Sequence, residues 1–586
     1  MRDTAICLTS VIWSQLKISV SRMANLISVA KGDRPADLVL SNARVINVFS
    51  GEIELGDVAI SGGRIAGIGD YNRAEQVTDL GGRFLAPGFI DGHVHLESSM
   101  LDVAQYARAV VPHGTTAIVT DLHEIANVAG LSGMRYIIDR ARRLPFELFL
   151  MAPSCVPATH LETSGASLDA SALRQVLRWR GCVGLGEMMN FPGVLGGDES
   201  VLTKIGLAKG KVVDGHAPGV SGKYLSAYIA AGIHSDHESL TLAEAKEKLR
   251  KGMYVMIREG SSEKNLDALL PLVTDNTYKR CLLVVDDRSC VDLLDDGDID
   301  AVVHKAIARG LEPVRAIQLA TINPAEYFHL NGLGAVASGY RANLVVISDL
   351  ANLRIDMVFH RGHLVASKGK PLFPANSGGG RELAGTVNIK PFSIGALRLR
   401  VAGETFHVIE VVPGQIITRK SLEMVNTEDG FAIPDIERDI LKLVVVERHK
   451  ATGNIGLGLV KGFGLKRGAI ASSIAHDSHN IVAVGTSDED IYAAVKEIER
   501  LQGGLVAVAG GRVEASLALP VAGLLSDEPL EAVVSKLSLL EQTVADMGVK
   551  LTSPFSTLSF VALPVIPELR LTDFGLVDVL QFKLIE

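Results

Sequence analysis

Two histidines stand one residue apart at the end of an apolar segment, in the stretch DGHVHLE that covers residues 91–97. Side chains two positions apart on a strand project from the same face, so His93 and His95 could bind one metal ion together. A pair of buried polar residues without a ligand is the alternative interpretation. The other ligands of a metal site must therefore come from elsewhere in the chain.

Further potential ligands follow other short apolar segments between residues 88 and 340, where strand-like and helical segments alternate. Eight strand ends can be counted there, each followed by polar residues. Eight β/α units in about 250 residues are typical of a (β/α)8 barrel, whose chemistry lies at the C-terminal ends of its strands. We therefore predict a TIM-like α/β barrel. A doubly wound open sheet is the alternative, but no G-x-G-x-x-G motif follows the first strand.

Histidines and carboxylates at these strand ends could meet at one rim of the barrel. They are His93 and His95 after the first strand, Glu187 after the fourth, His216 after the fifth, His237 after the sixth and Asp286 after the eighth. Such a set exceeds the needs of one tetrahedral zinc ion and suits two divalent ions bridged by a carboxylate. Nitrogen and oxygen ligands favour Mn, Fe(II) or Zn. Because two such ions can convert a shared water to hydroxide, the sequence predicts metal-assisted hydrolysis at an electrophilic carbon.

Composition and charge exclude several other classes of protein. The formal net charge of -9 disfavours a nucleic-acid polymer as partner, which leaves a small-molecule substrate. The five cysteines contain no C-x-x-C pair, so a reducing, cytoplasmic compartment is expected. No apolar segment reaches the roughly 18 residues of a membrane-spanning helix. A homodimer is expected from the general prevalence of symmetric assemblies.

The regions flanking the barrel differ from it in pattern. Residues 1–34 are predicted to be an N-terminal extension, and residues 35–87 alternate β-like segments with Gly-rich turns. A similar pattern returns at residues 341–375, which predicts one small composite β domain into which the barrel, residues 88–340, is inserted. Residues 376–586 are predicted to form a C-terminal α+β domain that contains the amphipathic helix DEDIYAAVKEIERLQ.

The motifs resemble one known family. The segments that carry the resemblance are PGFIDGHVHLESSM, VTDLHEIANV, GEMMNFPGVLGGD, DGHAPGVSG, DHES, MIREGS and VVDDR. Together with the split β domain, they resemble the amidohydrolase superfamily and, within it, the adenine deaminases. The resemblance spans roughly residues 35–370, and the C-terminal segment is similar to the extra domain of that family.

The resemblance implies a specific reaction. It is hydrolytic deamination of adenine to hypoxanthine and ammonia, a step of purine salvage, by a hydroxide bound at a binuclear metal centre. Many superfamily members bridge their metals with a carboxylated lysine after strand four; Glu187 stands there instead, which argues against the dihydroorotase and hydantoinase branches. Another amidohydrolase acting on a cyclic amide, another nucleobase or an N-acyl amino acid is the alternative, and a metal-binding protein without catalysis is a second.

Two carboxylates are candidates for proton transfer in this reaction. Asp286 could ligate one ion, accept the proton of the attacking water and pass it to the departing amine. Glu238 is our candidate for the acid that protonates the purine ring. Its alternative role is to orient His237, beside which it stands.

Other site residues are weaker candidates. His123, with Glu124, could be an additional metal ligand or contact the substrate. The candidates for substrate binding are Ser98, Ser99, Arg258 and Glu259. The alternatives are helix capping for the serines and an ion pair at the rim for the last two. In the C-terminal domain, AHDSHN places His476, Asp477 and His479 together, where we expect a polar turn rather than another ion site or a contact with a neighbouring subunit.

Overall fold

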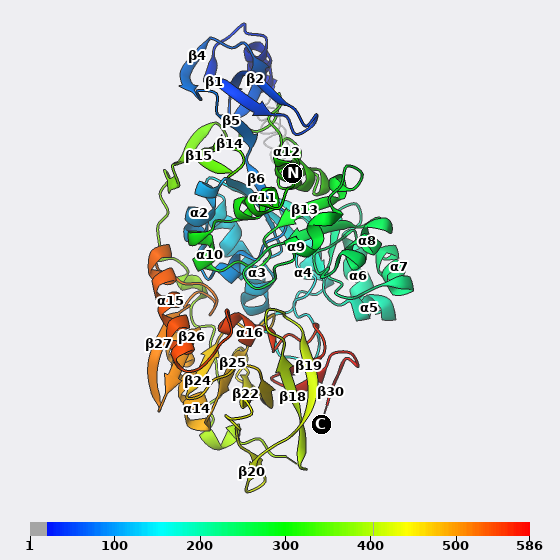
Figure 1. Ribbon diagram of the computed structural model, residues 1–586, viewed down its shortest axis with the longest axis vertical. Coiled ribbons are helices and arrows are strands. Elements are labelled where there is room, and N and C mark those ends of the chain that lie inside the picture. The colour runs from blue at the N-terminus through cyan, green and yellow to red at the C-terminus, as the bar shows by residue number, and fades with distance from the viewer. Residues whose placement is uncertain (1–19, 402, 586) are drawn as a thin grey trace, which may run out of the picture.

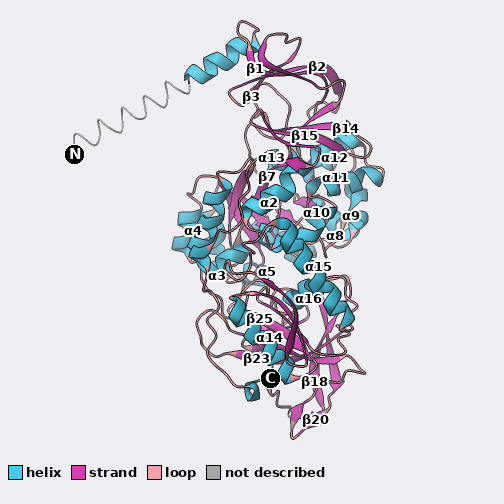
Figure 2. Ribbon diagram, turned by 90° about the vertical axis from the view of Figure 1, so that its left-hand side faces the viewer, coloured by secondary structure: helices cyan, strands magenta, loops and turns pink. Residues whose placement is uncertain are grey.

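The computed structural model describes residues 20–401 and 403–585 (Figure 1). Three parts follow one another along the long axis of the molecule: a β domain, a barrel and a C-terminal domain. Figure 2 shows the same order from the side. Of the predicted N-terminal extension, residues 1–19 lie outside the described residues. Residues 20–30 form a helix, and Val29 packs against the β domain.

The β domain is one sheet built from both flanks of the barrel, as predicted. Its strand order is β17-β16-β15-β14-β5-β1-β2-β3, with β4 paired to β1. The antiparallel pairing of β5 with β14, in which Leu85 lies opposite Val346, joins the two flanks. The bounds are β1 (Ala36–Ile46), β2 (Ile53–Ser61), β3 (Arg64–Gly69), β4 (Ala74–Asp79), β5 (Phe84–Pro87), β14 (Leu344–Asp349), β15 (Arg354–His360), β16 (His363–Ser367) and β17 (Lys370–Pro371).

Eight short parallel strands form the predicted barrel. They are β6 (Phe89–Asp91), β7 (Thr115–Thr120), β8 (Glu147–Ala152), β9 (Cys182–Met188), β10 (Val212–Gly215), β11 (Ser235–Asp236), β12 (Tyr254–Arg258) and β13 (Cys281–Val284). The first five and the last three are paired in sequence order. The ring closes where Asp286 N donates to His93 O at 3.0 Å and His95 N donates to Asp286 O at 3.2 Å. Closure therefore brings the first and last predicted ligands together.

Helices cover the barrel strands, which explains why strands such as β7 and β13 are buried along their whole length. The helices of this region are α2 (Val103–Val110), α3 (His123–Ala141), α4 (Ala170–Val176), α5 (Phe191–Gly196), α6 (Glu199–Leu207), α7 (Gly222–Ala230), α8 (Leu242–Arg250), α9 (Leu266–Leu269), α10 (Cys290–Asp295), α11 (Ile299–Ala308), α12 (Pro313–Leu319) and α13 (Ile322–Tyr327).

The C-terminal domain is α+β, as predicted, and is built on an eight-stranded sheet of order β19-β18-β23-β22-β25-β24-β26-β27. Its central strand β22, with the sequence ILKLVVV, is entirely buried. The predicted amphipathic helix is α14, which buries Ile491, Ala494, Val495 and Ile498 along one face.

The principal elements of this domain have the following bounds: β18 (Thr405–Val411), β19 (Thr418–Met424), β20 (Thr427–Glu428), β21 (Phe431–Ala432), β22 (Ile440–Val446), β23 (Ile455–Lys461), β24 (Ala469–Ser472), β25 (Ile481–Gly485), α14 (Asp488–Leu501), β26 (Gly504–Ala509), β27 (Arg512–Ala518), α15 (Leu530–Asp546), α16 (Pro554–Phe560), β28 (Leu569–Thr572), β29 (Gly575–Asp578) and β30 (Lys583–Leu584). Helices α15 and α16 lie on the side of the sheet that faces the barrel (Figure 1).

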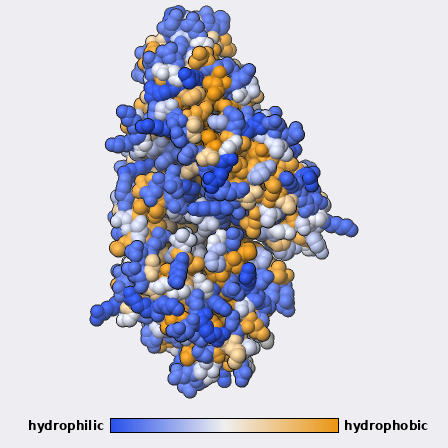
Figure 3. All heavy atoms as spheres, viewed as in Figure 1, coloured by the Kyte–Doolittle hydropathy of each residue, from blue (hydrophilic) through white to orange (hydrophobic). Residues whose placement is uncertain are grey.

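The C-terminal domain contacts the barrel through hydrogen bonds between polar side chains of the two domains. Arg108 Nη1 donates to Glu531 Oε2 at 2.8 Å, and Thr163 Oγ1 donates to Asp573 Oδ2 at 2.6 Å. Hydrophilic and hydrophobic residues are interspersed over the face drawn in Figure 3. Within the described ranges, no helix combines the length and apolar character that crossing a bilayer requires.

Candidate metal centre

Glu187 lies at the middle of a cluster of histidines on the barrel rim. It is the sixth residue of β9 and is 2% exposed. Its Oε1 is 3.3 Å from His95 Nε2, whereas its Oε2 is 2.7 Å from His216 Nδ1 and 3.3 Å from His237 Nε2. The two oxygens of one carboxylate thus face two different sets of imidazoles, which is the arrangement expected of a bridging ligand.

Asp286 completes the side of the cluster formed by His93 and His95. Its Oδ1 is 3.5 Å from His93 Nε2 and 3.3 Å from His95 Nε2. The residue has a left-handed backbone with φ of 64°, which aspartate tolerates better than most side chains. A strained backbone at the end of a strand is common at functional positions.

The donor atoms fit two divalent ions. Bonds of about 2.0–2.2 Å to nitrogen and oxygen place the ligands of a tetrahedral ion roughly 3.3–3.6 Å apart, close to most of these separations. His93 Nε2 is buried and has no hydrogen-bond partner among the described residues, so its lone pair is free for a metal. One set comprises His93, His95, Asp286 and Oε1 of Glu187; the other comprises His216, His237 and Oε2 of Glu187. The structure thus brings together all six residues of the predicted set.

Asp121 adjoins this cluster and was not singled out in the sequence. It follows β7, accepts a hydrogen bond from His123 Nδ1 at 2.8 Å and lies 3.4 Å from His95 Nδ1. Gly186 makes room for it, because a Cβ there would lie 2.7 Å from the Asp121 Cβ. Asp121 therefore orients two imidazoles. The signal that could have revealed it is its position two residues before His123 in the strand-end sequence TDLHE.

Arg258 neutralises two buried carboxylates beside the metal centre. Its Nη2 donates to Glu238 Oε2 and its Nη1 donates to Asp286 Oδ2, both at 2.9 Å. Burial alone raises the pKa of Glu238, but Arg258, His216 and His237 outweigh it, and the resulting pKa lies below the ordinary value. Glu238 is therefore ionised at neutral pH, which argues against its predicted role as a proton donor. Arg258, which was predicted to contact the substrate, is engaged in these ion pairs.

Asp286 and Glu263 have opposite electrostatic environments. Burial opposes ionisation of Asp286, but the close imidazoles of His93 and His95, with the charges of His237 and Arg258, hold its pKa well below the ordinary value. Burial and then the charge of Asp287 raise the pKa of Glu263 to about 8, although Arg258 acts in the opposite direction. Both Glu263 carboxylate oxygens are buried and have no hydrogen-bond partner among the described residues. Glu263, in the loop after β12, was not anticipated from the sequence.

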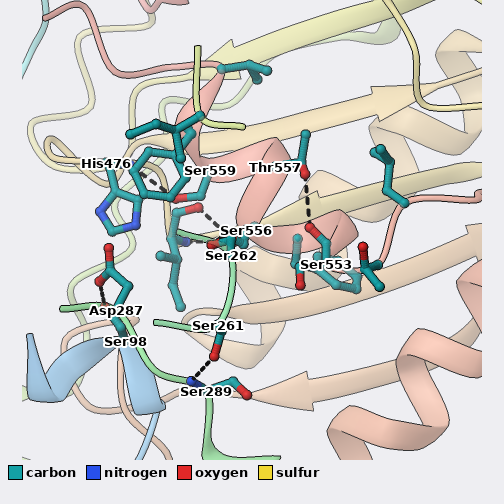
Figure 4. A pocket seen from close by; sticks show the side chains of 18 of the residues that line it. Ser98, Ser261, Ser262, Asp287, Ser289, His476, Ser553, Ser556, Thr557 and Ser559 are labelled. Carbon is teal, nitrogen blue, oxygen red and sulfur yellow. Dashed lines mark hydrogen bonds between the residues drawn. The ribbon is translucent and has the colours of Figure 1, made fainter. Parts of the chain in front are cut away.

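Two adjoining cavities lie between the barrel rim and the C-terminal domain. A small one of about 30 Å³ is lined by Glu263 and by five of the six clustered residues, all except His93, and a larger one has a volume of about 480 Å³. Both are lined by Asp287, Ile416, His476 and Phe560, so they meet at these residues. Figure 4 shows the larger cavity, with Asp287 pointing toward His476. Three of the four shared residues belong to the C-terminal domain, which therefore forms part of the site.

The remaining predicted substrate residues differ in where they point. Ser98 lines the larger cavity and donates a hydrogen bond to Asp287. Ser99 instead donates to Leu96 O at 2.6 Å within its own turn. Glu259 binds Lys305 and accepts a hydrogen bond from Leu266 N at 3.0 Å. Ser99 and Glu259 line neither cavity, which favours the structural alternatives for both.

The histidine-rich segment of the C-terminal domain forms a turn between β24 and β25, but the turn is buried against the barrel. His476 Nδ1 lies 2.6 Å from Glu124 Oε1, and His479 contacts the other oxygen of the same carboxylate. The His476 ring stacks on Phe560, with centroids 4.5 Å apart. The turn is thus a contact between domains of one chain.

Family profiles and known proteins match most of the chain. The profile of the amidohydrolase family matches residues 84–365, and that of the adenine deaminase C-terminal domain matches residues 415–583. The chain is 62% identical over 565 residues to a protein of Dehalococcoides mccartyi named adenine deaminase, which covers 96% of this chain and 99% of that protein. It is 50% identical over 562 residues to adenine deaminase 2 of Carboxydothermus hydrogenoformans, covering 96% and 98%.

Proposed function

Because the chain belongs to the adenine deaminase family of amidohydrolases, which are hydrolases of C–N bonds, we propose that its rim cluster binds two divalent ions and deaminates adenine there. The family implies a divalent metal centre, and the nitrogen and oxygen donors favour Mn or Fe(II), with Zn also compatible. One observation carries the proposal: the two oxygens of Glu187 are divided between His95 on one side and His216 with His237 on the other.

The reaction exchanges one bond at C6 of adenine for another. Water adds to C6, the bond from C6 to the exocyclic amino nitrogen breaks, and the products are hypoxanthine and ammonia. Two ions bound by the six residues would supply Lewis acidity that lowers the pKa of water toward neutrality. The protein residues must then move protons and stabilise the charges that develop during the reaction.

Asp286 is suited to carry the proton of the attacking water. Its low pKa keeps it ionised, and therefore able to accept a proton, throughout the neutral range. Arg258 holds its Oδ2 at 2.9 Å, while Oδ1 faces His93 and His95. Asp286 can then return the proton to the amino nitrogen as it leaves as ammonia.

Glu263 is suited to protonate the purine ring. A carboxyl with a pKa of about 8 is largely protonated at pH 7 and can donate. It regains a proton from the new C6 hydroxyl, which becomes the carbonyl of hypoxanthine. It lines the small cavity together with Asp286 and Arg258. We therefore assign it the donor role that the sequence had given to Glu238, whose ion pair with Arg258 keeps it ionised.

The larger cavity provides a route by which adenine reaches this centre. Its volume of about 480 Å³ is ample for a purine, and it meets the small cavity at Phe560, His476, Ile416 and Asp287. The aromatic and aliphatic side chains there suit a flat, apolar ring, and the serines suit its nitrogen atoms. The C-terminal domain thus contributes to substrate binding while the barrel performs the chemistry.

The proposal is tested by stripping the chain of metal, reloading it with Mn or Fe(II) and incubating it with adenine. Equal amounts of ammonia and hypoxanthine are expected, and the Glu187→Gln variant should produce neither at a comparable rate. A loaded chain that leaves adenine unchanged but opens a cyclic amide would contradict the assignment.

A further inference from the structure

We propose that a second, separate metal site joins the C-terminal domain to the barrel, with His123, Cys155 and Asp477 as ligands and Glu124 as the fourth. This site lies outside the proposed catalytic pair and goes beyond the proposed function. Its chemical class is a divalent transition-metal ion bound by nitrogen, sulfur and oxygen, such as Zn(II).

The ligand atoms are close enough for one ion. Those of His123, Cys155 and Asp477 all lie within 4.8 Å of one another. His123 Nε2 is 3.8 Å from Asp477 Oδ1 and 3.2 Å from Glu124 Oε1. Bonds of 2.0–2.3 Å in a tetrahedral site separate neighbouring ligands by roughly 3.3–3.8 Å. Small side-chain shifts therefore suffice to bring His123, Cys155 and Asp477 around one ion, and Glu124 stands beside His123 as the fourth candidate.

The orientation of His123 separates this site from the catalytic one. Its Nδ1 is bonded to Asp121 at 2.8 Å, on the side of His95 and Glu187. With that hydrogen bond donated from Nδ1, the lone pair of Nε2 points the other way, toward Glu124 and Asp477. A carboxylate that fixes the outer nitrogen of a ligand histidine is a common feature of metal sites. The two sites therefore lie on opposite sides of one imidazole ring.

The Glu124 carboxylate is held in place by the buried turn of the C-terminal domain. His476 Nδ1 lies 2.6 Å from Oε1 of Glu124, and His479 Nε2 contacts Oε2. These two imidazoles orient the carboxylate in the way that groups around a metal ligand usually do. His476 and His479 lie on either side of Asp477 in the sequence. One turn therefore supplies the proposed ligand Asp477 and also the two histidines that orient Glu124.

The cluster also contains a buried carboxylate oxygen, Oδ2 of Asp477, that lacks a hydrogen-bond partner among the described residues. Asp477 is 1% exposed. Cys155 and His123 are buried beside it. A buried carboxylate without a cation or donor is unfavourable, and a divalent ion removes that penalty. Because Asp477 belongs to the C-terminal domain and the other ligands to the barrel, the ion would fix the position of the domain that covers the active site.

Cobalt tests this site independently of turnover, because a thiolate bound to Co(II) gives a charge-transfer absorption band in the near ultraviolet. The proposed catalytic ligands contain no sulfur, so they give no such band. The full-length chain, stripped of metal and reloaded with Co(II), should show the band and bind three cobalt ions per chain. Coordination displaces the thiol proton of Cys155, so the band appears as a proton is released.

Two matched cysteine variants control for folding. Cys155→Ser should abolish the band and reduce the metal content from three ions to two. Cys182→Ser, which alters another buried free cysteine on β9, should leave both unchanged. Asp477→Asn provides a second way to weaken the site without altering the thiol. A spectrum without the band, or a band that Cys155→Ser leaves intact, overturns the proposal whatever the metal content.

The outcome is distinguishable from a failure of the proposed function. Glu187→Gln removes the bridge of the catalytic pair, yet it should keep the cobalt–thiolate band. A chain that deaminates adenine but lacks the band retains the proposed function and loses only the second site. A chain with the band and no deamination does the reverse.

Discussion

The two walls of the active site are built differently. On the barrel side, the functional groups follow strand ends, and closure of the strand ring fixes their positions, as the hydrogen bonds between His93, His95 and Asp286 show. On the C-terminal side, the wall consists of Ile416, Phe560 and the buried turn that contains His476. None of these residues belongs to the six predicted ligands of the catalytic pair. The difference indicates that one wall carries the chemistry and the other shapes the space for substrate. Substitutions in the two walls should therefore affect different kinetic constants.

The largest effect is expected on the barrel side, from Asp286→Asn. The amide is nearly the same size but cannot accept the proton of water, so kcat should fall on the order of 10³- to 10⁴-fold. Most of the metal should remain, because five of the six rim ligands are intact. Turnover and metal content measured on one preparation check this, and unchanged turnover would remove Asp286 from the mechanism.

Next in size is Arg258→Met, which tests the electrostatics of the same wall. It leaves Glu238 and Asp286 as buried carboxylates without their cation, so we expect a loss of about 3–5 kcal/mol in the free energy of unfolding. The exposed pair of Arg309 with Asp267 provides the control, where Arg309→Met should cost about 1 kcal/mol or less. Denaturant unfolding of both variants measures the difference, and equal losses would contradict the buried network.

Glu263→Gln sharpens the assignment of proton donor. Since the pKa of Glu263 is about 8, the donating form predominates below that pH and is lost above it, so the turnover of the unaltered protein should fall as pH rises through about 8. The variant should be roughly 100-fold slower at pH 7 and should lack this alkaline decline. Rate–pH profiles of the two proteins check the prediction. The same decline in both would assign the donor to another group.

The smallest effect is expected on the C-terminal wall, from Phe560→Ala. The variant loses one aromatic contact with the purine, which contributes about 1–1.5 kcal/mol to the free energy of binding. KM should therefore rise roughly tenfold, and kcat should stay nearly unchanged. Phe574→Ala, at a residue 45% exposed in the same domain, is the control and should change neither constant. A fall in kcat as large as that of Asp286→Asn would erase the distinction between the two walls.

The sequence could predict the barrel and the gathering of the six proposed ligands at its rim because each of these residues stands at or directly after the end of an apolar segment, and parallel strands must end at one edge of a barrel. It could not show the proton donor. Glu263 lies in a loop without periodic pattern, and the ionised state of Glu238 depends on Arg258, twenty positions away in the chain.

The contacts of the C-terminal domain with the barrel could not be predicted from the sequence either. The contact of His476 with Glu124 joins positions 352 residues apart, and the sequence around neither residue indicates that the two would meet. Asp121 is an intermediate case, since its spacing from His123 at the end of β7 was visible but its position depends on Gly186 of β9, which is separated from β7 by β8.

The central claim is that Glu187 bridges two ions on the barrel rim, and it is tested most directly by anomalous diffraction at the manganese edge from crystals grown with Mn(II). At the rim, two peaks are predicted, one on each side of the Glu187 carboxylate and roughly 3.5–4 Å apart, with His93, His95 and Asp286 around one and His216 and His237 around the other; an ion at the separate site of His123, Cys155 and Asp477 would give a further peak away from Glu187. A single peak at the rim, or rim peaks that leave Glu187 uncoordinated, would contradict the account.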